Sequence, residues 1–201
     1  MHNFRTIILA SASPRRKEIL EKTGLKFKVD KSLLEENVIP GMKPREFARF
    51  LSREKAREVA KRHKNALVIA ADTIILFRGR IFGKPLNRDH ATEMLKALSG
   101  KVHSVITGFT IMDTADGKEA TGSVETKVFF KRLSDEDIKA YVNSGEPMDK
   151  AGAYGIQGLG ALLIKRIDGD FFNVAGLPLS TLGEKLKKFG ISVLESNKVY
   201  Y

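Results

Sequence analysis

A twelve-residue apolar run at positions 66–77 constrains the fold of this chain more than any other stretch. It reads Ala-Leu-Val-Ile-Ala-Ala-Asp-Thr-Ile-Ile-Leu-Phe, and Asp72 is its single ionisable side chain. A strand this continuously apolar has to be covered on both faces, which predicts a sheet with helices packed on it. A carboxylate in such a strand costs several kcal/mol unless it is paired, hydrogen-bonded or metal-bound. We interpret Asp72 as a functional residue, with a structural acid as the alternative.

The second informative stretch is a predicted strand-to-helix turn at residues 10–16. Residues 6–10 are apolar, and Ser13 followed by Pro14 is typical of a helix N-cap with proline at the first helical position. The unpaired N–H groups of a helix start favour an anion, and Ser11, Arg15 and Arg16 add a hydroxyl and two guanidiniums. This pattern predicts a phosphate site, and the alternative is an ordinary capped helix with two solvated arginines.

The remaining pattern alternates amphipathic helices with strands, which predicts an α/β protein. A single domain is expected over residues 1–194, with a tail at 195–201. Arg78-Gly79 and residues 115–117 predict hairpin turns. Further strands are expected at 26–29, 102–113, 119–131 and 162–167, and helices at 14–23, 44–63, 87–98, 135–143 and 178–189. Ser134, followed by three acidic residues, is the expected N-cap of the helix at 135–143.

Residues 149–160 contain four glycines without being low in complexity. Glycines spaced in this way indicate that the backbone closely approaches something, either a ligand or a neighbouring strand, and the sequence favours neither. The spacing matches no Walker or dinucleotide-binding loop. Residues 171–177 are expected to form an apolar connection.

Composition excludes several kinds of chemistry. The chain has no cysteine, so disulfides, thiolate metal sites and cysteine nucleophiles are excluded, and its four histidines lack metal-binding spacing. Any metal is therefore expected to be oxygen-bound. No apolar run is long enough for a membrane span and no signal peptide is evident, so we expect a cytoplasmic protein without membrane contact. The net charge of +11 fits either a lysine-rich surface or a polyanionic partner.

Together these signals favour phosphate chemistry. Hydrolysis of a phosphoanhydride needs cations to absorb charge, a divalent metal on carboxylates, and a base to position water. Asp72 fits the base, and the arginines and lysines fit a phosphate clamp. No histidine is directed at Ser11 or Ser13 by the sequence pattern, so nucleophilic serine catalysis is not supported.

The ordered motifs between residues 7 and 182 resemble those of the Maf proteins, which are nucleoside triphosphate pyrophosphatases named for septum formation. The matching segments are Ala10-Ser11-Ala12-Ser13-Pro14-Arg15-Arg16, Arg53-Glu54-Lys55-Ala56, Ala71-Asp72-Thr73, Gly83-Lys84-Pro85, Ser99-Gly100 to His103 with Thr107-Gly108, residues 149–158, and residues 173–178.

This resemblance implies hydrolysis between the α and β phosphates, giving a nucleoside monophosphate and pyrophosphate, with Mg²⁺ or Mn²⁺ as cofactor. It assigns Asp72 as the proton acceptor. It implies that Asp72, Lys84 and Lys55 are catalytic and that Glu36 and Asp72 bind the metal. The residues that it implies for substrate binding are Ser11, Ser13, Arg15, Arg16, Thr73 and Gln157. Either Glu35 or Glu36 could be the equivalent of the family's loop acid.

The form Ala-Gly-Ala-Tyr-Gly-Ile-Gln-Gly at 151–158 resembles the branch that acts on dTTP and UTP. The amide of Gln157 carries a donor and an acceptor, which matches the imide edge of uracil or thymine. The implied fold is α/β, with a long twisted mixed β-sheet flanked by helices, two lobes and a central cleft, and commonly a homodimer.

Two alternative functions remain open at this point. One is a pyrophosphatase of the same class for another nucleotide, such as a modified pyrimidine, inosine, xanthosine or 7-methylguanosine triphosphate. The other is a cell-division regulatory or nucleic-acid-binding protein without hydrolysis. No stable nucleic-acid complex is expected, because no basic cluster is interleaved with aromatic residues.

Overall fold

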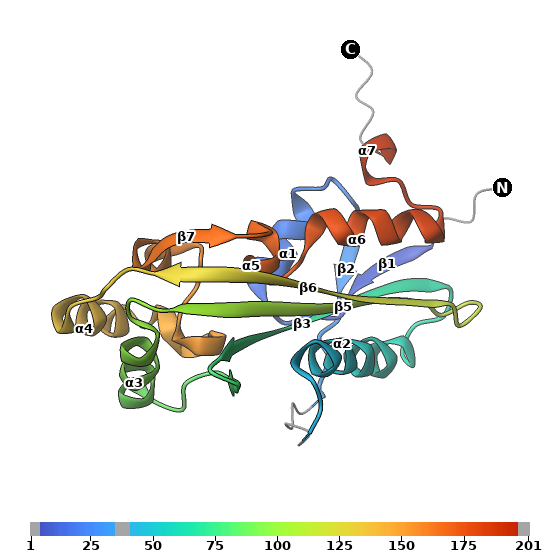
Figure 1. Cartoon of the computed structure of the whole chain (residues 1–201). Coiled ribbons are helices and arrows are strands. Elements are labelled where there is room, and N and C mark those ends of the chain that lie inside the picture. Colours follow the sequence, from blue (N-terminus) through green and yellow to red (C-terminus); the bar gives the residue numbers. More distant parts are fainter. Residues whose placement is uncertain (1–4, 35–40, 197–201) are drawn as a thin grey trace, which may run out of the picture. The chain divides into compact units, whose positions relative to one another are not determined.

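The structure is a computed structural model that describes residues 5–34 and 41–196 of the chain (Figure 1). Among these residues, seven strands form one mixed sheet in the order β2-β1-β3-β5-β6-β7, with β4 paired to β3. The strands are β1 (Thr6–Leu9), β2 (Phe27–Val29), β3 (Ala66–Phe77), β4 (Arg80–Phe82), β5 (Val102–Asp113), β6 (Glu119–Phe130) and β7 (Ile164–Asp168). The expected mixed α/β sheet is confirmed.

The sheet is mixed, with parallel pairs at its N-terminal strands and antiparallel pairs at β4 and β7. β1 lies parallel to both β2 and β3, with Ile7 opposite Phe27 and Leu67. β4 and β7 pair antiparallel with β3 and β6. Arg78 and Gly79 both have positive φ, as the two central residues of a type I′ hairpin turn require.

The helices are α1 (Pro14–Glu21), α2 (Pro44–Ala60), α3 (Arg88–Leu98), α4 (Asp135–Asn143), α5 (Phe171–Ala175), α6 (Leu179–Leu186) and α7 (Val193–Ser196), with 3-10 turns η1 (Glu146–Asp149), η2 (Ala151–Ala153), η3 (Gly158–Leu163) and η4 (Lys187–Phe189). The predicted caps are confirmed. Ser13 caps α1, and Ser134 forms a reciprocal capping box with Asp137 at the start of α4. None of the helices in the described part of the chain is long and apolar enough to cross a bilayer.

Two expectations about local structure were wrong, and a third was confirmed with a change of helix type in its last turn. Residues 158–163 form a 3-10 turn, so the strand expected at 162–167 begins only at Ile164. The expected connection at 171–177 contains α5, because the Asp170 carboxylate accepts a hydrogen bond from Phe172 N at 2.7 Å and so caps the turn. The helix expected at 178–189 is α6 followed by η4. Short apolar runs do not separate strand from helix by period alone.

The chain divides into two compact units. Unit 1 contains residues 1–72, 107–124 and 176–201, and unit 2 contains residues 73–106 and 125–175. The strands β3, β5 and β6 contribute residues to both units. A single domain over residues 1–194 with a tail at 195–201 stays a prediction; residues 197–201 of that tail lie outside the described part.

Each unit has a core of its own. In unit 1, small and β-branched residues of α2 pack on β1 and β3, and α2 and α6 lie on opposite sides of the strands (Figure 1). In unit 2, apolar residues of α3 and α4 cover the strands together with aromatic side chains. The buried residues of the unit 1 cluster are Ile8, Ala10, Ala56, Val59, Ala66, Val68 and Ala70.

The backbone of α2 lies directly on β5 at Gly108. A Cβ atom built on Gly108 would lie 2.1 Å from the carbonyl oxygen of Ala48 and 2.6 Å from the nitrogen of Arg49. One turn further along α2, the hydroxyls of Ser52 and Thr110 are 3.0 Å apart and form a buried hydrogen bond. Gly108 therefore sets the distance between α2 and the sheet, and Ser52 sets the position of α2 along it.

We predict that Gly108→Ala destabilises the protein by about 3 kcal/mol or more, because the added methyl group has no space against a helix backbone that cannot retreat without disturbing the core. The measurement is urea-induced unfolding. Gly183→Ala is the matched control, since an added Cβ there meets nothing within 4 Å and the site lies inside α6. The control should be neutral or slightly stabilising. Equal stabilities of the two variants would contradict this account of Gly108.

Candidate active site

The turn between β1 and α1 is built around the hydroxyl of Ser11. Ser11 is 7% exposed, and its Oγ accepts hydrogen bonds from Ser13 N at 3.2 Å and from Arg16 Nη1 at 3.3 Å. Ser13 Oγ in turn accepts a long hydrogen bond of 3.5 Å from Arg16 N. The structure therefore brings together Ser11, Ser13 and Arg16, three of the residues predicted for substrate binding.

Arg16 is held in place by the backbone as well. Its Nε donates to the carbonyl oxygen of Gly176 at 2.8 Å, which fixes the plane of the guanidinium. The first turn of α1 contains Arg15, Arg16 and Lys17 and no acidic residue. Cations at the positive end of a helix dipole are unfavourable by themselves and favourable when an anion binds there. The turn therefore suits an anionic ligand.

The pairing of β1 with β3 places this turn at the level of Asp72. Leu9 is opposite Ile69 in the parallel register, and Ala10 N donates to Ile69 O at 2.8 Å. Ser11 is two residues beyond Leu9, and Asp72 is three residues beyond Ile69. In parallel α/β sheets, ligands bind outside the carboxyl ends of the strands, and the β1–α1 turn occupies that position in unit 1.

Asp72 is buried, and its partner is Lys55 of α2. The Lys55 Nζ lies 2.5 Å from Asp72 Oδ1, and the two residues are 8% and 4% exposed. The sequence required a partner for Asp72, and the structure supplies one. The motif resemblance implies a site role for Lys55, and the tertiary structure shows that its side chain is buried against Asp72.

A buried charge is costly for Lys55 or Asp72 when its partner is missing. Removing one partner of a buried ion pair leaves an uncompensated charge and costs about 3–5 kcal/mol, whereas removing both is often nearly neutral. The pair is therefore a strong constraint on where α2 can lie.

We predict that Lys55→Met alone destabilises the protein by about 3–5 kcal/mol, because the Asp72 carboxylate stays buried without a counter-charge. Adding Asp72→Asn to that variant should restore more than half of the loss. Urea unfolding of the two single variants and the double variant measures the coupling. Lys61→Met, an exposed change at the end of the same helix, should stay within about 0.5 kcal/mol of wild type. Additive effects of the two single changes would contradict a buried ion pair.

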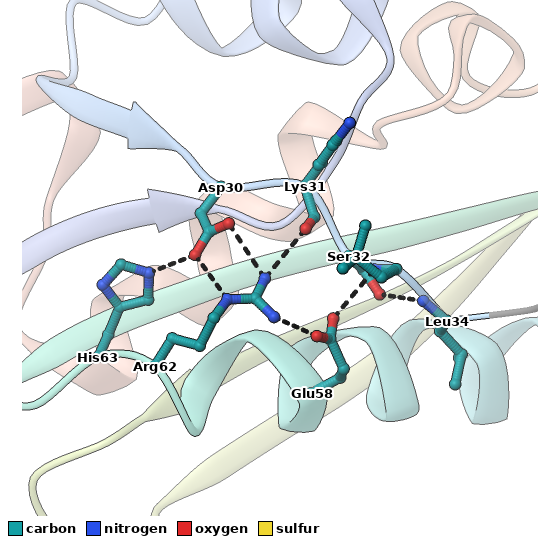
Figure 2. Close-up of polar contacts among 8 residues, drawn as sticks. Asp30, Lys31, Ser32, Leu34, Glu58, Arg62 and His63 are labelled. Atoms are coloured by element: carbon teal, nitrogen blue, oxygen red, sulfur yellow. Dashed lines mark hydrogen bonds and ion pairs between the residues drawn. The ribbon is translucent and has the colours of Figure 1, made fainter.

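Figure 2 shows a second polar cluster in unit 1, at the end of α2. Two of the three guanidinium nitrogens of Arg62, Nε and Nη2, donate to the carboxylate of Asp30, each at 3.0 Å. The third, Nη1, pairs with Glu58. His63 Nε2 lies 2.7 Å from Asp30 Oδ2. Glu58 Oε2 accepts from Leu33 N at 3.2 Å. Residues 30–34 are thereby tied to the end of α2.

The charges of this cluster are mutually favourable. Hydrogen bonds from Arg62 and His63 lower the pKa of Asp30 below its ordinary value of 3.8. Burial raises the pKa of Glu58, but hydrogen bonds from Ser32, Arg62 and Leu33 outweigh it, so the pKa is lowered overall from 4.5. Both acids therefore stabilise the fold above about pH 4.5, and that contribution is lost as the pH falls through their lowered pKa values.

Three further predicted residues belong to unit 2: Thr73, Lys84 and Gln157. Thr73 is the first residue of unit 2 and directly follows Asp72 along β3. The backbone next to Lys84 is fixed because Gly152 N donates to Gly83 O at 2.9 Å. A Cβ on Gly152 would lie 2.4 Å from Ile75 Cδ1. The glycine at 152 thus permits close packing against both β3 and the Gly83 turn.

Gln157 is half-buried and directly precedes η3. Its Oε1 is buried and accepts no hydrogen bond within the described part of the chain. A buried acceptor without a partner costs free energy, and such groups call for a bound molecule or a functional role. Gln157 therefore has an unused acceptor of the kind that the sequence analysis assigns to base recognition.

A neutral histidine anchors the segment just before Gln157. His103 of β5 is 3% exposed, and its Nε2 lies 2.6 Å from the hydroxyl of Tyr154. Burial lowers the pKa of His103 to about 4, and burial, with a smaller effect from Tyr141, raises the pKa of Tyr154 well above 10.0. Both groups are therefore neutral at pH 7, and the rings of His103, Tyr154 and Phe130 pack edge to face.

We predict that His103 makes the protein less stable as the pH falls from 6.5 towards 4. The unfolded chain binds a proton on this side chain in that interval and the folded chain does not, so stability falls by up to about 1.4 kcal/mol per pH unit. His103→Gln should remove this slope, because an amide can still hydrogen-bond Tyr154 without titrating. Urea unfolding of both proteins between pH 4.5 and 7 measures the difference, and parallel curves would contradict the assignment.

The predicted metal ligands are only partly within the described residues. Glu35 and Glu36 lie outside them. Among residues 5–34 and 41–196, no cluster of three or more histidine, aspartate or glutamate side chains could hold a metal ion. Asp72 contributes one buried carboxylate. Such a donor set fits Mg²⁺, which proteins commonly bind through one or two carboxylates together with substrate phosphates.

The fold and the site define an α/β protein with a turn suited to an anion at the level of a buried lysine–aspartate pair. The chain belongs to the Maf family, because the family model described as Maf-like protein matches residues 6–189. The resemblance seen in the sequence motifs is thereby confirmed over nearly the whole chain.

Two relatives that are about half identical to this chain have the same name. A dTTP/UTP pyrophosphatase of Methanosarcina barkeri is 51% identical over 193 residues, which cover 96% of this chain and 98% of the relative. A dTTP/UTP pyrophosphatase of Clostridioides difficile is 48% identical over 91% of this chain and 94% of the relative. Among solved structures, a HAM1 protein from Coxiella burnetii matches with a TM-score of 0.48 and 16% identity, over 92% of this chain and 100% of that chain.

Proposed function

We propose that this protein is a nucleoside triphosphate pyrophosphatase that hydrolyses dTTP and UTP to the monophosphate and pyrophosphate. Membership of the Maf family and relatives of about half-identical sequence with that activity support the proposal. The structural observation that carries it is the buried Lys55–Asp72 pair at the level of the β1–α1 turn. Phosphoanhydride hydrolysis needs a base and cations, and unit 1 supplies both.

In the proposed reaction, the β1–α1 turn binds the phosphates. Arg16 presents its guanidinium in a plane set by the Gly176 carbonyl, and Ser11 and Ser13 present hydroxyls beside the first N–H groups of α1. Arg15 adds a second guanidinium in the same helical turn. These donors stabilise the charge that develops on the phosphate oxygens in the transition state.

Asp72 takes the proton from the attacking water. The carboxylate is fixed by its ion pair with Lys55, so its position is held before the substrate arrives. Lys55 adds a positive charge where negative charge accumulates, and Lys84 of unit 2 is assigned the same electrostatic role. The proton passes to Asp72, the water oxygen bonds to the α-phosphorus, and the bond to the bridging oxygen breaks to release pyrophosphate.

Asp72 and Glu36 are proposed to hold a divalent metal ion, Mg²⁺ or Mn²⁺, together with the triphosphate. When bound, the ion neutralises phosphate charge and so lowers the barrier to attack by water. By the family resemblance, Arg15, Thr73 and Gln157 are assigned to base preference, with the amide of Gln157 suited to the imide edge of uracil and thymine. A homodimer, a cytoplasmic location and the absence of a nucleic-acid partner stay predictions.

We predict that the purified protein with Mg²⁺ or Mn²⁺ releases pyrophosphate from UTP and dTTP. Asp72→Asn should lower kcat at least about 100-fold, because the amide cannot accept the proton. Asp116→Asn is the matched control, since Asp116 lies in the exposed β5–β6 turn, and it should keep wild-type activity. Circular dichroism verifies that each variant is folded.

Release of inorganic phosphate in place of pyrophosphate would overturn the proposed reaction. An Asp72→Asn variant as active as wild type would overturn the role of Asp72. Efficient pyrophosphate release from 7-methyl-GTP or inosine triphosphate, with little from UTP or dTTP, would show that the substrate is another nucleotide.

A further inference from the structure

The six-residue turn that carries Gln157, residues 155–160, is closed on itself. A Cβ built on Gly160 would lie 2.1 Å from the carbonyl oxygen of Gly155, so the two ends of the turn are in contact. Gly158 has a φ of +71°, which allows the chain to reverse between them. Only glycine at these positions permits a turn this tight. Gln157 lies at its outer part, half-exposed.

Glu146 is the residue that holds this turn shut. Its Oε2 accepts a hydrogen bond from Leu159 N at 2.9 Å, and its Oε1 accepts from Gly160 N at 3.0 Å. The same Oε1 accepts from the hydroxyl of Tyr141 at 2.9 Å. One carboxylate therefore satisfies two backbone N–H groups at the start of η3, which suits the partial positive charge of a helix start.

Tyr141 holds the other end of the turn. Its hydroxyl accepts a hydrogen bond from Gly155 N at 3.3 Å while donating to Glu146. Tyr141 is 5% exposed and lies on α4, so it is itself fixed by the core of unit 2. Backbone N–H groups on both sides of Gln157 are thus bound to one connected pair of side chains.

This arrangement fixes the backbone around Gln157 but does not use its side-chain Oε1. The Oε1 of Gln157 has no partner among the described residues, although three backbone N–H groups within three residues of it are satisfied. A side chain that recognises a ligand by hydrogen bonds needs an acceptor kept free and a backbone that does not move. The carboxylate of Glu146 supplies the second condition.

We propose that Glu146, acting with Tyr141, is the positioning residue that gives Gln157 its discrimination between bases. The inference rests on the proposed function, in which Gln157 sets the preference for uracil and thymine. Glu146 does not touch the substrate in this account. It fixes the turn 155–160, and the preference for the base follows from the fixed amide of Gln157.

The proposal is tested with Glu146→Gln. The amide keeps the size of the side chain but can accept at only one of the two oxygen positions, so at least one of Leu159 N and Gly160 N faces an N–H group and loses its acceptor. The ratio of kcat/KM for UTP to that for CTP should fall roughly tenfold, the equivalent of about one hydrogen bond lost in recognition. Tyr141→Phe should lower the ratio in the same direction, and provides a second variant if the first does not fold.

Two controls separate positioning from a general loss of stability. Glu136→Gln, an exposed change on α4, should leave the ratio as in wild type. In a Gln157→Ala background the ratio is already reduced, and adding Glu146→Gln should change it by less than about twofold, because the positioned group is gone. A purely structural Glu146 would lower kcat/KM for both nucleotides equally in either background.

The outcomes distinguish this inference from the proposed function. A folded wild-type protein that releases no pyrophosphate from any nucleotide, or that does not prefer UTP to CTP, would overturn the proposed function and this inference with it. A wild-type protein that prefers UTP, with Glu146→Gln and Tyr141→Phe variants of unchanged ratio, would overturn the inference alone. Fully additive effects of Glu146→Gln and Gln157→Ala on the UTP-to-CTP ratio of kcat/KM would overturn the inference as well.

Discussion

The burial of one negative charge constrains most of unit 1. Asp72 lies inside a strand that is otherwise apolar, and the ammonium group of Lys55 compensates it at 2.5 Å. That contact requires α2 to approach the sheet closely, which a side chain at position 108 would prevent. The packing of α2, the glycine beneath it and the hydroxyl pair of Ser52 and Thr110 are consequences of the same requirement, because a buried ion pair tolerates little change in geometry.

Apart from Lys84, the polar groups described above differ in kind between the two units. Unit 1 holds charged groups, namely the guanidiniums at the start of α1 and the Lys55–Asp72 pair, and interactions between charges extend over distance. In unit 2 the contacts described above are directional hydrogen bonds: neutral His103 contacts Tyr154, and Glu146 accepts from backbone N–H groups, while Oε1 of Gln157 has no partner among the described residues. Charge suits a triphosphate, whereas directional hydrogen bonds suit the edge of a base.

Local sequence signals predicted the helix starts and turns that depend on interactions between neighbouring residues. Ser13 before Pro14 and Ser134 before three acids act within one helical turn, and both caps are present. The Arg78-Gly79 hairpin likewise depends on two adjacent residues. The 3-10 turn at 158–163 and the helix α5 were missed because each depends on a distant or unexpected acceptor, Glu146 for the first and the Asp170 carboxylate for the second. Glu146 between Gly145 and Pro147 indicates only a turn when it is read in sequence.

The sequence by itself determined three features: a sheet covered by helices, a turn suited to an anion, and the need of Asp72 for a partner. Each follows from a few neighbouring residues, through apolar continuity, helix capping and the cost of a buried charge respectively. Only the tertiary structure decided that the partner is Lys55, that α2 rests on Gly108, and that Glu146 closes the turn around Gln157. Those contacts join residues 13 to 60 positions apart in the chain, where the folded backbone and not the local pattern sets which side chains meet.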